Sequence, residues 1–405
     1  MRVLLIDVNC KSSSTGQIVY NLYSYLNSHG DEAAVCYGRG EKIIERNIYK
    51  FGLDWETYFH ALMTRLTGFT GCFSFFSTIR LIRYIKRFNP DVVHIHELHA
   101  YFVNIKPLIS YLKDNHIRTV MTLHCEFAYT GKCGHSLECE QWKTGCNHCP
   151  HLRDYVSTLW FDQTKYMFDQ KKKLFTNFEE LRIVTPSNWL ADRVVQSFLG
   201  NHKIDIIHNS VDTSIFHPRD AKQLRRKLGI ADDEKVVLAL APHLMSEAKG
   251  GEYVLQLAKK NEQEKIKFIF VGVDGECRID IPNVIIHGAI KDKDLISEFY
   301  SLADMFIICS KRENFPTTCI EAQCCGTPVF GFDTGGTKET DISGLNLFSE
   351  YQNIDILCEN MRYVLFHHEI NRMELSEKAI SSFSLEAFSK NYYNLYKEAI
   401  SKDEE

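Results

Sequence analysis

Glu313-Asn-Phe-Pro-Thr-Thr-Cys-Ile-Glu321, followed by Ala-Gln-Cys-Cys-Gly326, sets two carboxylates eight positions apart across an expected loop-to-helix junction. Pro316 suits the first helical position, because its ring fixes φ and its missing N–H would have no partner there. Gly326 suits the position just past the helix end. Glu313 then belongs to the loop that enters the helix, and Glu321 projects from its first turns.

The helix start at Thr317 and Thr318 is a candidate anion site. The first N–H groups of a helix have no acceptor within it, and the helix dipole favours negative charge there. The segment thus offers a cradle for a diphosphate between two groups that accept hydrogen bonds from sugar hydroxyls. Two glutamates at this spacing are by themselves more often solvated helix charges, but their combination with the helix start favours a nucleotide-sugar site.

The stretch resembles the Glu-x7-Glu element of the family-4 glycosyltransferases, and the match continues through Gly326-Thr-Pro-Val and Gly335-Gly336 to Glu339. The resemblance implies the GT-B fold, in which two Rossmann-like α/β domains face a cleft. It also implies that Glu313 contacts the donor sugar and Glu321 the donor ribose. Asn314, Phe315 and Pro316 are expected to take part in donor binding with them.

Composition limits the classes of protein that this chain can be. At 405 residues it is long enough for two ordinary domains, and its net charge of −5 argues against a general nucleic-acid binder. Asp7 interrupts the first apolar run too early for a signal peptide, and no run approaches the ~20 apolar residues that span a bilayer. We therefore expect a cytoplasmic protein, or one on the inner face of the plasma membrane. Its 14 cysteines should then be mostly thiols.

Short β-branched runs alternate with helical patterns along the whole chain, which predicts parallel sheets covered by helices on both faces. The polar stretch from His208 to Pro218 separates two such sets and resembles a family segment at this place. We expect an N-terminal acceptor-side domain over residues 1–210 and a C-terminal nucleotide-sugar domain over 211–385. By resemblance, a helix at about 386–402 packs back on the first domain. The predicted strands are Val3–Val8, Ala33–Tyr37, Val92–His96, Thr119–Leu123, Arg182–Thr185, Ile204–Ile207, Val236–Ala241, Phe268–Val271, Val284–His287, Met305–Cys309 and Val329–Phe332.

Two loops that follow predicted strands carry further donor-site candidates. Gly16 ends the loop after the first strand, where a glycine lets the backbone approach a ligand, although serine and threonine caps explain that loop equally well. By resemblance, Gly16 faces the donor phosphates. Lys249 ends the loop Ala241–Gly250 and resembles the family lysine that neutralises the donor diphosphate. The family arginine near the start of this loop is missing, since His243 and Leu244 occupy that region.

Histidines lie at the ends of two predicted strands, which is where ligands bind in open α/β sheets. Thr122-Leu-His124 matches a family position whose histidine contacts the donor sugar or the acceptor. His124 is therefore our third catalytic candidate, with Lys249 and Glu313. His96 and His99 are weaker candidates, because neutral histidines bonded to the backbone are common at sheet edges.

Cys133-x5-Cys139-x6-Cys146-x2-Cys149 is the least expected pattern in the chain. Four cysteines this close have the ligand types of a closed tetrahedral zinc site. A redox-labile disulfide pair and unliganded thiols are the alternatives. The surrounding Trp-Lys-Thr-Gly-Cys-x2-Cys-Pro run, with Tyr37-Gly-Arg-Gly40, resembles enzymes of colanic-acid and other surface-polysaccharide assembly. A structural zinc would brace a loop on the acceptor side, and the resemblance implies no metal or other cofactor at the reaction centre.

Aromatic and basic residues mix between Phe59 and Phe88. Such a segment can rest on anionic lipid, which would suit an acceptor carried on a polyprenyl diphosphate. The ordinary explanation is a core-facing helix pair with a solvated basic side.

These observations together predict a retaining glycosyltransferase. It would move a sugar from a UDP- or GDP-linked donor to a hydroxyl of a growing bacterial surface polysaccharide, such as an O-antigen, capsule or exopolysaccharide. A sugar-nucleotide epimerase, a glycan phosphorylase and a non-catalytic glycan-binding subunit are the alternatives on the same fold.

Overall fold

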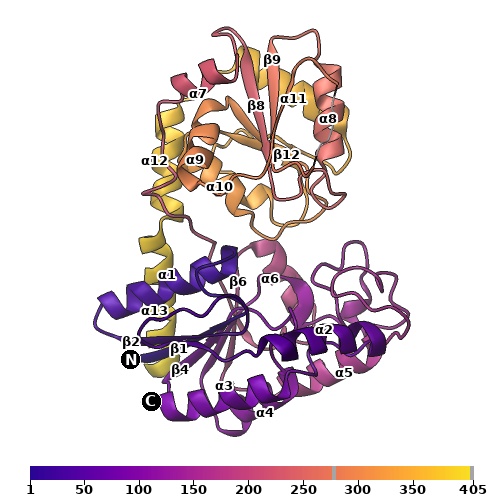
Figure 1. Cartoon of the computed structure of the whole chain (residues 1–405), viewed down its shortest axis with the longest axis vertical. Helices are drawn as coiled ribbons and strands as arrows, with labels where there is room; N and C mark the ends of the chain where they lie inside the picture. Colours follow the sequence, from indigo (N-terminus) through magenta and orange to yellow (C-terminus); the bar gives the residue numbers. More distant parts are fainter. Residues whose placement is uncertain (276–279, 402–405) are drawn as a thin grey trace. The chain divides into compact units, whose positions relative to one another are not determined.

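The computed structural model describes residues 1–275 and 280–401, and the chain divides into two compact units. Unit 1 comprises Met1–Ile207 together with the end of the chain from Ser389, and unit 2 comprises His208–Phe388 (Figure 1). Each unit is built around one parallel sheet, so the predicted α/β class is confirmed. None of the described helices is long and apolar enough to cross a membrane.

The sheet of unit 1 has seven parallel strands in the order β3-β2-β1-β4-β5-β6-β7. Leu4 of β1 lies beside Ala34 of β2 on one side and Val93 of β4 on the other. The strands are β1 (Arg2–Asp7), β2 (Glu32–Tyr37), β3 (Ile48–Lys50), β4 (Val92–Ile95), β5 (Thr119–Thr122), β6 (Leu181–Thr185) and β7 (Lys203–Ile206). The helices are α1 (Ser14–Ser28), α2 (Asp54–Thr67), α3 (Phe75–Phe88), α4 (Ile105–Asp114), α5 (Thr164–Phe175) and α6 (Asn188–Val195), with 3₁₀ turns at Glu126–Ala128 and Gln141–Lys143.

Unit 2 repeats this arrangement with six parallel strands in the order β10-β9-β8-β11-β12-β13. Val237 of β8 lies beside Phe268 of β9 and Met305 of β11. The strands are β8 (Lys235–Leu240), β9 (Ile266–Val271), β10 (Val284–His287), β11 (Met305–Ile308), β12 (Val329–Phe332) and β13 (Phe348–Ser349). The helices are α7 (Lys222–Lys227), α8 (Gly251–Lys260), α9 (Lys293–Leu302), α10 (Thr317–Cys324), α11 (Ile354–His367) and α12 (Arg372–Phe383), with a 3₁₀ turn at Lys338–Thr340.

Both faces of the second sheet are covered, which explains its nearly continuous apolar strands. In β8, Val236 and Leu238 pack into one core cluster, while Val237 and Ala239 pack into another on the opposite face. The predicted strands agree with the observed ones to within two residues at each end. The short strands β3 and β13 were missed, because three and two residues are too few to show a period.

The chain leaves unit 1 after Ile207, three residues before the predicted boundary at 210. The reason is that Asn209 and Val211 already form hydrogen bonds in unit 2, the first with the carbonyl of Phe315 and the second with that of Phe383. The chain returns to unit 1 within α13 (Leu385–Ser401), whose residues from Ser389 onward belong to that unit. The predicted helix began at 386, and its expected last residue, 402, lies outside the described residues.

Buried hydroxyl groups attach α13 to the sheet of unit 1. The Tyr396 hydroxyl lies 2.6 Å from Nδ1 of His94, and the Tyr392 hydroxyl lies 2.9 Å from Oγ1 of Thr122. His94 is fully buried, and this burial lowers its pKa well below the usual range, so the ring is neutral. Because buried polar groups need partners, these bonds fix where the last helix packs in unit 1.

Candidate active site

Three neighbouring strands of unit 2 bring the sequence-predicted donor residues to one edge of the sheet. β8, β11 and β12 are adjacent and parallel, so the loops that follow them leave from the same edge. These loops carry Lys249, Glu313 and Gly335. The carbonyl of Ala248 accepts a hydrogen bond from the Lys311 N–H at 2.9 Å, and the carbonyl of Glu313 accepts one from Gly336 at 3.0 Å.

Lys249 and Glu313 form the central contact of this edge, with Nζ 2.7 Å from Oε1. Both side chains are partly shielded, at 33% and 19% exposure. Two glycines make the approach of the loops feasible. Gly250 and Gly335 both have positive φ, and a Cβ would lie 2.1 Å from the Cys309 carbonyl oxygen in the first case and 1.9 Å from that of Glu313 in the second. Sequence analysis predicted that Lys249 and Glu313 belong to one site, and the structure brings the two side chains together.

Helix α10 starts one residue later than predicted. Pro316 is the N-cap with an extended backbone, and Thr317 is the first helical residue, so the placement of Pro316 inside the helix was wrong. Gly326 follows the helix end with φ near +79°, as expected. The N-cap residue, Pro316, makes no side-chain cap hydrogen bond to the N-terminus of α10. Thr317 and Thr318 are half-buried at this start, which leaves backbone N–H groups available to an anion.

Asn314 and Phe315 lie deeper than donor-contacting side chains would. They are 8% and 3% exposed, and the Phe315 ring belongs to the core of unit 2. It stacks on His208 at 4.6 Å between ring centroids, and its carbonyl accepts a hydrogen bond from Asn209. In this structure the Phe315 side chain therefore supports the loop rather than facing a ligand.

Glu321 lies one turn further along α10 and is partly buried. The Tyr300 hydroxyl donates a hydrogen bond to its Oε2 at 3.0 Å, and Thr317 also hydrogen-bonds this carboxyl group. Burial raises the pKa of Glu321 from 4.5 to about 7, which outweighs these hydrogen bonds. The group can therefore exist as a neutral acid or as a carboxylate near neutral pH.

The start of the lysine loop differs from the family pattern in structure as well as in sequence. Leu244 is 4% exposed and packs in the core, and the exposed His243 forms a contact of 2.6 Å with Asp274. His243 therefore does not join the contact between Lys249 and Glu313.

In unit 1 the structure places polar side chains after β1, β4 and β5, which end at one edge of the sheet. Gly16 lies in the first turn of α1, where a Cβ would come within 3.2–3.3 Å of Asn9. This close approach explains the glycine without a ligand, so the role of Gly16 in donor binding stays a prediction. Asp7 ends β1 at 0% exposure, and burial, with a contribution from Glu97, raises its pKa to about 8.

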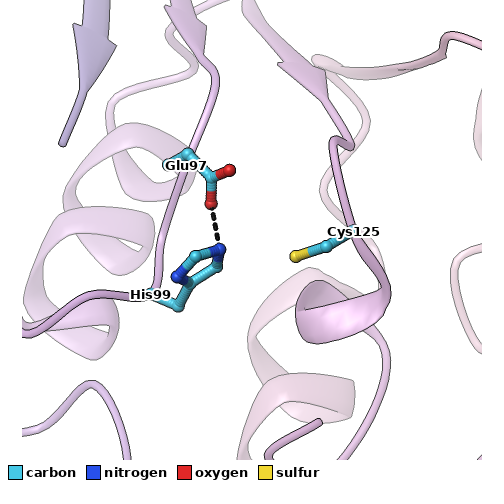
Figure 2. A group of neighbouring side chains, drawn as sticks. All are labelled: Glu97, His99 and Cys125. Carbon is cyan, nitrogen blue, oxygen red and sulfur yellow. Dashed lines mark ion pairs between the residues drawn. The ribbon is translucent and has the colours of Figure 1, made fainter. Parts of the chain in front are cut away.

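Glu97, His99 and Cys125 form a group beside this edge in which Glu97 is buried and the other two side chains are half-buried (Figure 2). Oε2 of Glu97 lies 2.5 Å from Nε2 of His99, and Nδ1 of His99 lies 3.0 Å from the Tyr155 hydroxyl. Burial disfavours the charge on His99, but Glu97 outweighs it and raises the pKa of the ring well above its usual value. A buried imidazolium–carboxylate pair results. Among the described residues, this is the one group of three or more His, Cys, Asp or Glu side chains whose ligand atoms lie within 4.8 Å of one another.

His124 lines the same pocket as this group. Its Nε2 lies 3.2 Å from Nδ1 of His96, and burial lowers its pKa, so the ring is neutral. His96 is 2% exposed, and its buried Nε2 has no hydrogen-bond partner among the residues that the structure describes. His124 is thus at a strand end as predicted. Sequence reasoning missed Asp7, Glu97 and Cys125. Asp7 lies near the end of the first predicted strand, Glu97 directly follows the strand that ends at His96, and Cys125 directly follows His124.

The four clustered cysteines line one small cavity in the long segment between β5 and α5. All four are free thiols, and the thiols of Cys133 and Cys149 form a hydrogen bond. In the described residues no three of the four sulfur atoms lie within 4.8 Å of one another, so the tetrahedral arrangement is not formed.

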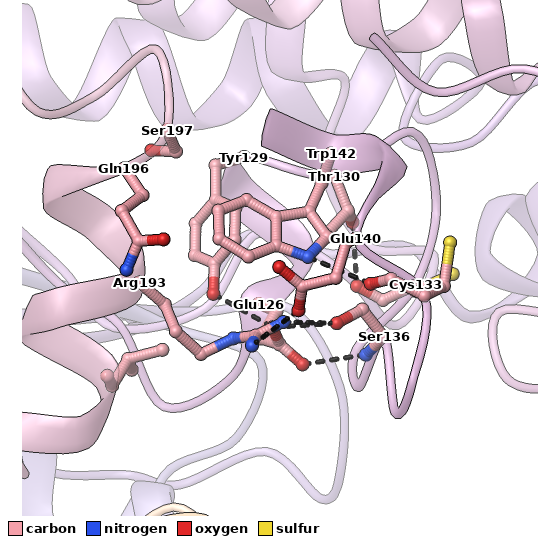
Figure 3. Close-up of polar contacts among 12 residues, drawn as sticks. Glu126, Tyr129, Thr130, Cys133, Ser136, Glu140, Trp142, Arg193, Gln196 and Ser197 are labelled. Atoms are coloured by element: carbon pink, nitrogen blue, oxygen red, sulfur yellow. Dashed lines mark hydrogen bonds and ion pairs between the residues drawn. The ribbon is translucent and has the colours of Figure 1, made fainter. Parts of the chain in front are cut away.

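A charged network attaches this segment to α6 (Figure 3). Nε of Arg193 lies 2.7 Å from Oε1 of the buried Glu126 carboxylate. This carboxylate also accepts a hydrogen bond from the Ser136 N–H at 2.6 Å. The Arg193 guanidinium lies 4.4 Å from the ring centroid of the fully buried Trp142. The segment is thus an ordered part of unit 1.

Comparisons with known proteins agree with the division of the chain into two units. Residues 15–215 match the family described as Glycosyltransferase Family 4, and residues 220–381 match the family described as Glycosyl transferases group 1. The chain belongs to the GT-B glycosyltransferases. The resemblance seen in the sequence is therefore confirmed.

Individual relatives of this GT-B glycosyltransferase span most of its length. WcaC of Escherichia coli K12, named as a colanic acid biosynthesis glycosyl transferase, is 25% identical over 332 residues, which are 76% of each chain. Sucrose-phosphate synthase from Thermosynechococcus elongatus superimposes with a TM-score of 0.72 at 16% identity and 99% coverage of both chains. HepE of Anabaena in complex with UDP-glucose has a TM-score of 0.65 at 15% identity, with coverage of 98% of this chain and 100% of HepE. The two structural likenesses show the shared fold.

Glu321 provides a prediction about the pH dependence of stability. Its pKa is higher in the folded protein than the usual 4.5, so the folded state binds more protons between these values. The free energy of unfolding should therefore fall as pH rises from about 4.5 to about 7, by at most about 3 kcal/mol from this group. Urea unfolding of the parent and of Glu321→Gln at several pH values measures this contribution. The parent should lose stability relative to Glu321→Gln as pH rises through this range, whereas parallel curves would show that Glu321 titrates normally.

Proposed function

We propose that the chain transfers a sugar from a nucleotide-sugar donor to a hydroxyl of a growing bacterial surface polysaccharide, with retention of the anomeric configuration. The observation that carries this proposal is the contact of Lys249 with Glu313 beside the start of α10. It joins one cation, one carboxylate and a helix N-terminus at the carboxyl edge of a parallel sheet. Support for the donor class comes from HepE, whose structure contains UDP-glucose, and support for the product class from the name of WcaC.

In this mechanism the bond between the sugar C1 and the diphosphate oxygen breaks, and a bond between C1 and the acceptor oxygen forms. The departing diphosphate gains negative charge, and Lys249 with the N–H groups at Thr317 and Thr318 stabilises it. The acceptor proton passes to the leaving phosphate oxygen, so the step needs no protein base. Both the donor phosphate and Glu313 attract Lys249, and donor binding would therefore free the Glu313 carboxylate to orient the sugar hydroxyls.

Glu321 and His124 take the remaining roles in this proposal. As a carboxylate, Glu321 would accept hydrogen bonds from the ribose hydroxyls, which its pKa of about 7 permits near neutral pH. The neutral ring of His124 would border the acceptor and exchange hydrogen bonds with its hydroxyls, since a neutral imidazole has one donor and one acceptor nitrogen.

Replacement of Lys249 tests the proposal. Lys249→Met should lower kcat for acceptor-dependent release of UDP or GDP by about 100-fold, since one preorganised charge at a leaving group is worth that much. Lys249→Arg should retain more activity, because it keeps the charge. Lys260→Met is the matched control, since it breaks a 2.8 Å ion pair of the same unit with Asp355 far along α8.

The assay is run with a panel of UDP- and GDP-sugars, with and without glycan acceptors. Parental activity in Lys249→Met would contradict the assigned role of the lysine. Consumption of the donor without an acceptor would favour an epimerase or hydrolase over a transferase. Absence of any donor turnover, together with retained glycan binding, would favour a non-catalytic subunit.

A further inference from the structure

Helix α2 of unit 1 has its amphipathic pattern reversed. Its exposed face carries Trp55, Tyr58, Phe59 and Leu62, at 57%, 76%, 43% and 53% exposure. Its buried face is polar and consists of Glu56, Thr57, His60 and Thr64. A helix on the surface of a water-soluble domain normally buries its apolar stripe, so this exposed stripe requires its own explanation.

Specific polar contacts hold α2 in this orientation. The Glu56 carboxylate accepts hydrogen bonds from the N–H groups of Phe76 and Ser77, each at 2.8 Å, and so caps the start of α3. Nδ1 of His60 lies 2.7 Å from Oγ of Ser74. Rotation of the helix to bury its aromatic residues would break these contacts, and the outward aromatic stripe is therefore a stable property of the fold.

The first turns of α3 continue this apolar surface. Phe75, Phe76 and Ile79 are 52%, 59% and 45% exposed, and the rings of Trp55 and Phe76 lie 6.0 Å apart. We call Trp55, Tyr58, Phe59, Leu62, Phe75, Phe76 and Ile79 the α2–α3 face. Figure 1 shows both helices on the outside of the sheet of unit 1. The remainder of α3 packs normally, with Leu81, Ile85 and Phe88 buried.

Cations follow the α2–α3 face along both helices. Arg65, Arg83, Lys86 and Arg87 are exposed, and in the described part of the chain none of them forms an ion pair with a carboxylate. The one exposed acid on α2, Asp54, is paired with Lys50 at 2.8 Å. A positive, aromatic surface thus lies on a chain whose net charge is −5.

We infer that the α2–α3 face docks onto an anionic lipid bilayer, with its aromatic side chains in the interfacial layer and its cations at the lipid phosphates. Trp and Tyr have the amphipathic rings that this layer favours, Phe adds apolar surface, and cations are attracted to an anionic surface. A second copy of the chain is a poorer occupant, because the same unpaired cations would face each other. Both helices then lie in the plane of the interface. The inference does not depend on the proposed transfer reaction.

Vesicle flotation of the full chain tests this inference. The parent should bind vesicles of phosphatidylglycerol and phosphatidylcholine, and bind much less to phosphatidylcholine alone or at high salt. Trp55→Ser/Tyr58→Ser/Phe76→Ser should weaken binding at least tenfold, and Arg83→Glu/Lys86→Glu should weaken it for anionic vesicles only. These side chains are exposed, so folding should be retained. Tyr363→Ser/Phe366→Ser, on the exposed side of α11, is the matched control and should bind like the parent.

Three outcomes would overturn the assignment. The first is a parent that fails to bind anionic vesicles, and the second is a triple aromatic variant that binds as well as the parent. The third is a dimer of the parent, shown by light scattering, that the triple variant abolishes, which would identify a second copy as the occupant.

The cysteine cavity carries a second inference, because two buried lysines flank it. Lys132 and Lys171 are each 1% exposed. Nζ of Lys132 donates to the carbonyls of His151 and Asp154, and Nζ of Lys171 donates to those of Phe127 and Thr130. Within residues 1–275 and 280–401 neither lysine has a carboxylate within ion-pair distance. Buried ammonium groups without a counter-charge are costly.

We propose that Cys133, Cys139, Cys146 and Cys149 bind one zinc ion as thiolates and that the two lysines balance the site. Four thiolates and Zn²⁺ carry a net charge of −2, which the two ammonium groups neutralise. Lys132 lies near Cys133 and Cys149, and Lys171 lies near Cys146 and Cys133. Binding would draw the sulfur atoms together, displace their protons and brace a segment that has only two short 3₁₀ turns.

Elemental analysis of the purified, reduced full chain tests this site. It should contain about one zinc per chain and little iron. Cys133→Ser/Cys149→Ser should lose this zinc, and the control Cys72→Ser, a half-buried cysteine outside the cavity, should keep it. Cobalt added to the metal-depleted parent should give the absorption of tetrahedral thiolate coordination, which does not depend on the variants. Protein without metal, or zinc retained by the double variant, would overturn the proposal.

Discussion

The direction of the parallel strands is the constraint on which the candidate site depends. Across each sheet the strand numbers first fall and then rise. The change lies between β1 and β4 in unit 1 and between β8 and β11 in unit 2. At such a point the following loops go to opposite faces of the sheet and leave room at its carboxyl edge. In unit 2 that edge holds Lys249 and Glu313, and in unit 1 it holds Asp7 and Glu97. The position of the charged groups therefore follows from topology before any detail of side-chain packing.

The two edges have different electrostatic character, which suits different ligands. The edge of unit 2 combines a lysine with the N-terminus of α10, and this is an environment for a diphosphate. The edge of unit 1 has one charged histidine, two neutral histidines and two acids, of which Asp7 is held protonated near neutral pH by burial. Such a site can exchange hydrogen bonds with hydroxyl groups without attracting phosphate. This contrast is what a transferase with a charged donor and a neutral acceptor needs.

Much of the fold could be predicted from the sequence because both sheets are buried on both faces, which gives every long strand a clear apolar run. The proximity of Lys249 and Glu313 could likewise be predicted, since each residue follows a strand of the same sheet. The buried position of Phe315 could not be predicted, because its ring packs on His208, which lies more than a hundred positions away in the sequence. The spacing of Trp55, Tyr58, Phe59 and Leu62 is that of a core-facing stripe. Only the hydrogen bonds of Glu56 and His60 reveal that this stripe points outward.

The central claim is that the loop after β8 and the start of α10 together hold the nucleotide-sugar. Hydrogen–deuterium exchange of the full chain, with and without saturating UDP-sugar or GDP-sugar, tests it most directly. The account predicts new protection concentrated at residues 246–251 and 313–321. Donor binding that leaves both segments unprotected and protects other parts of the chain would contradict it.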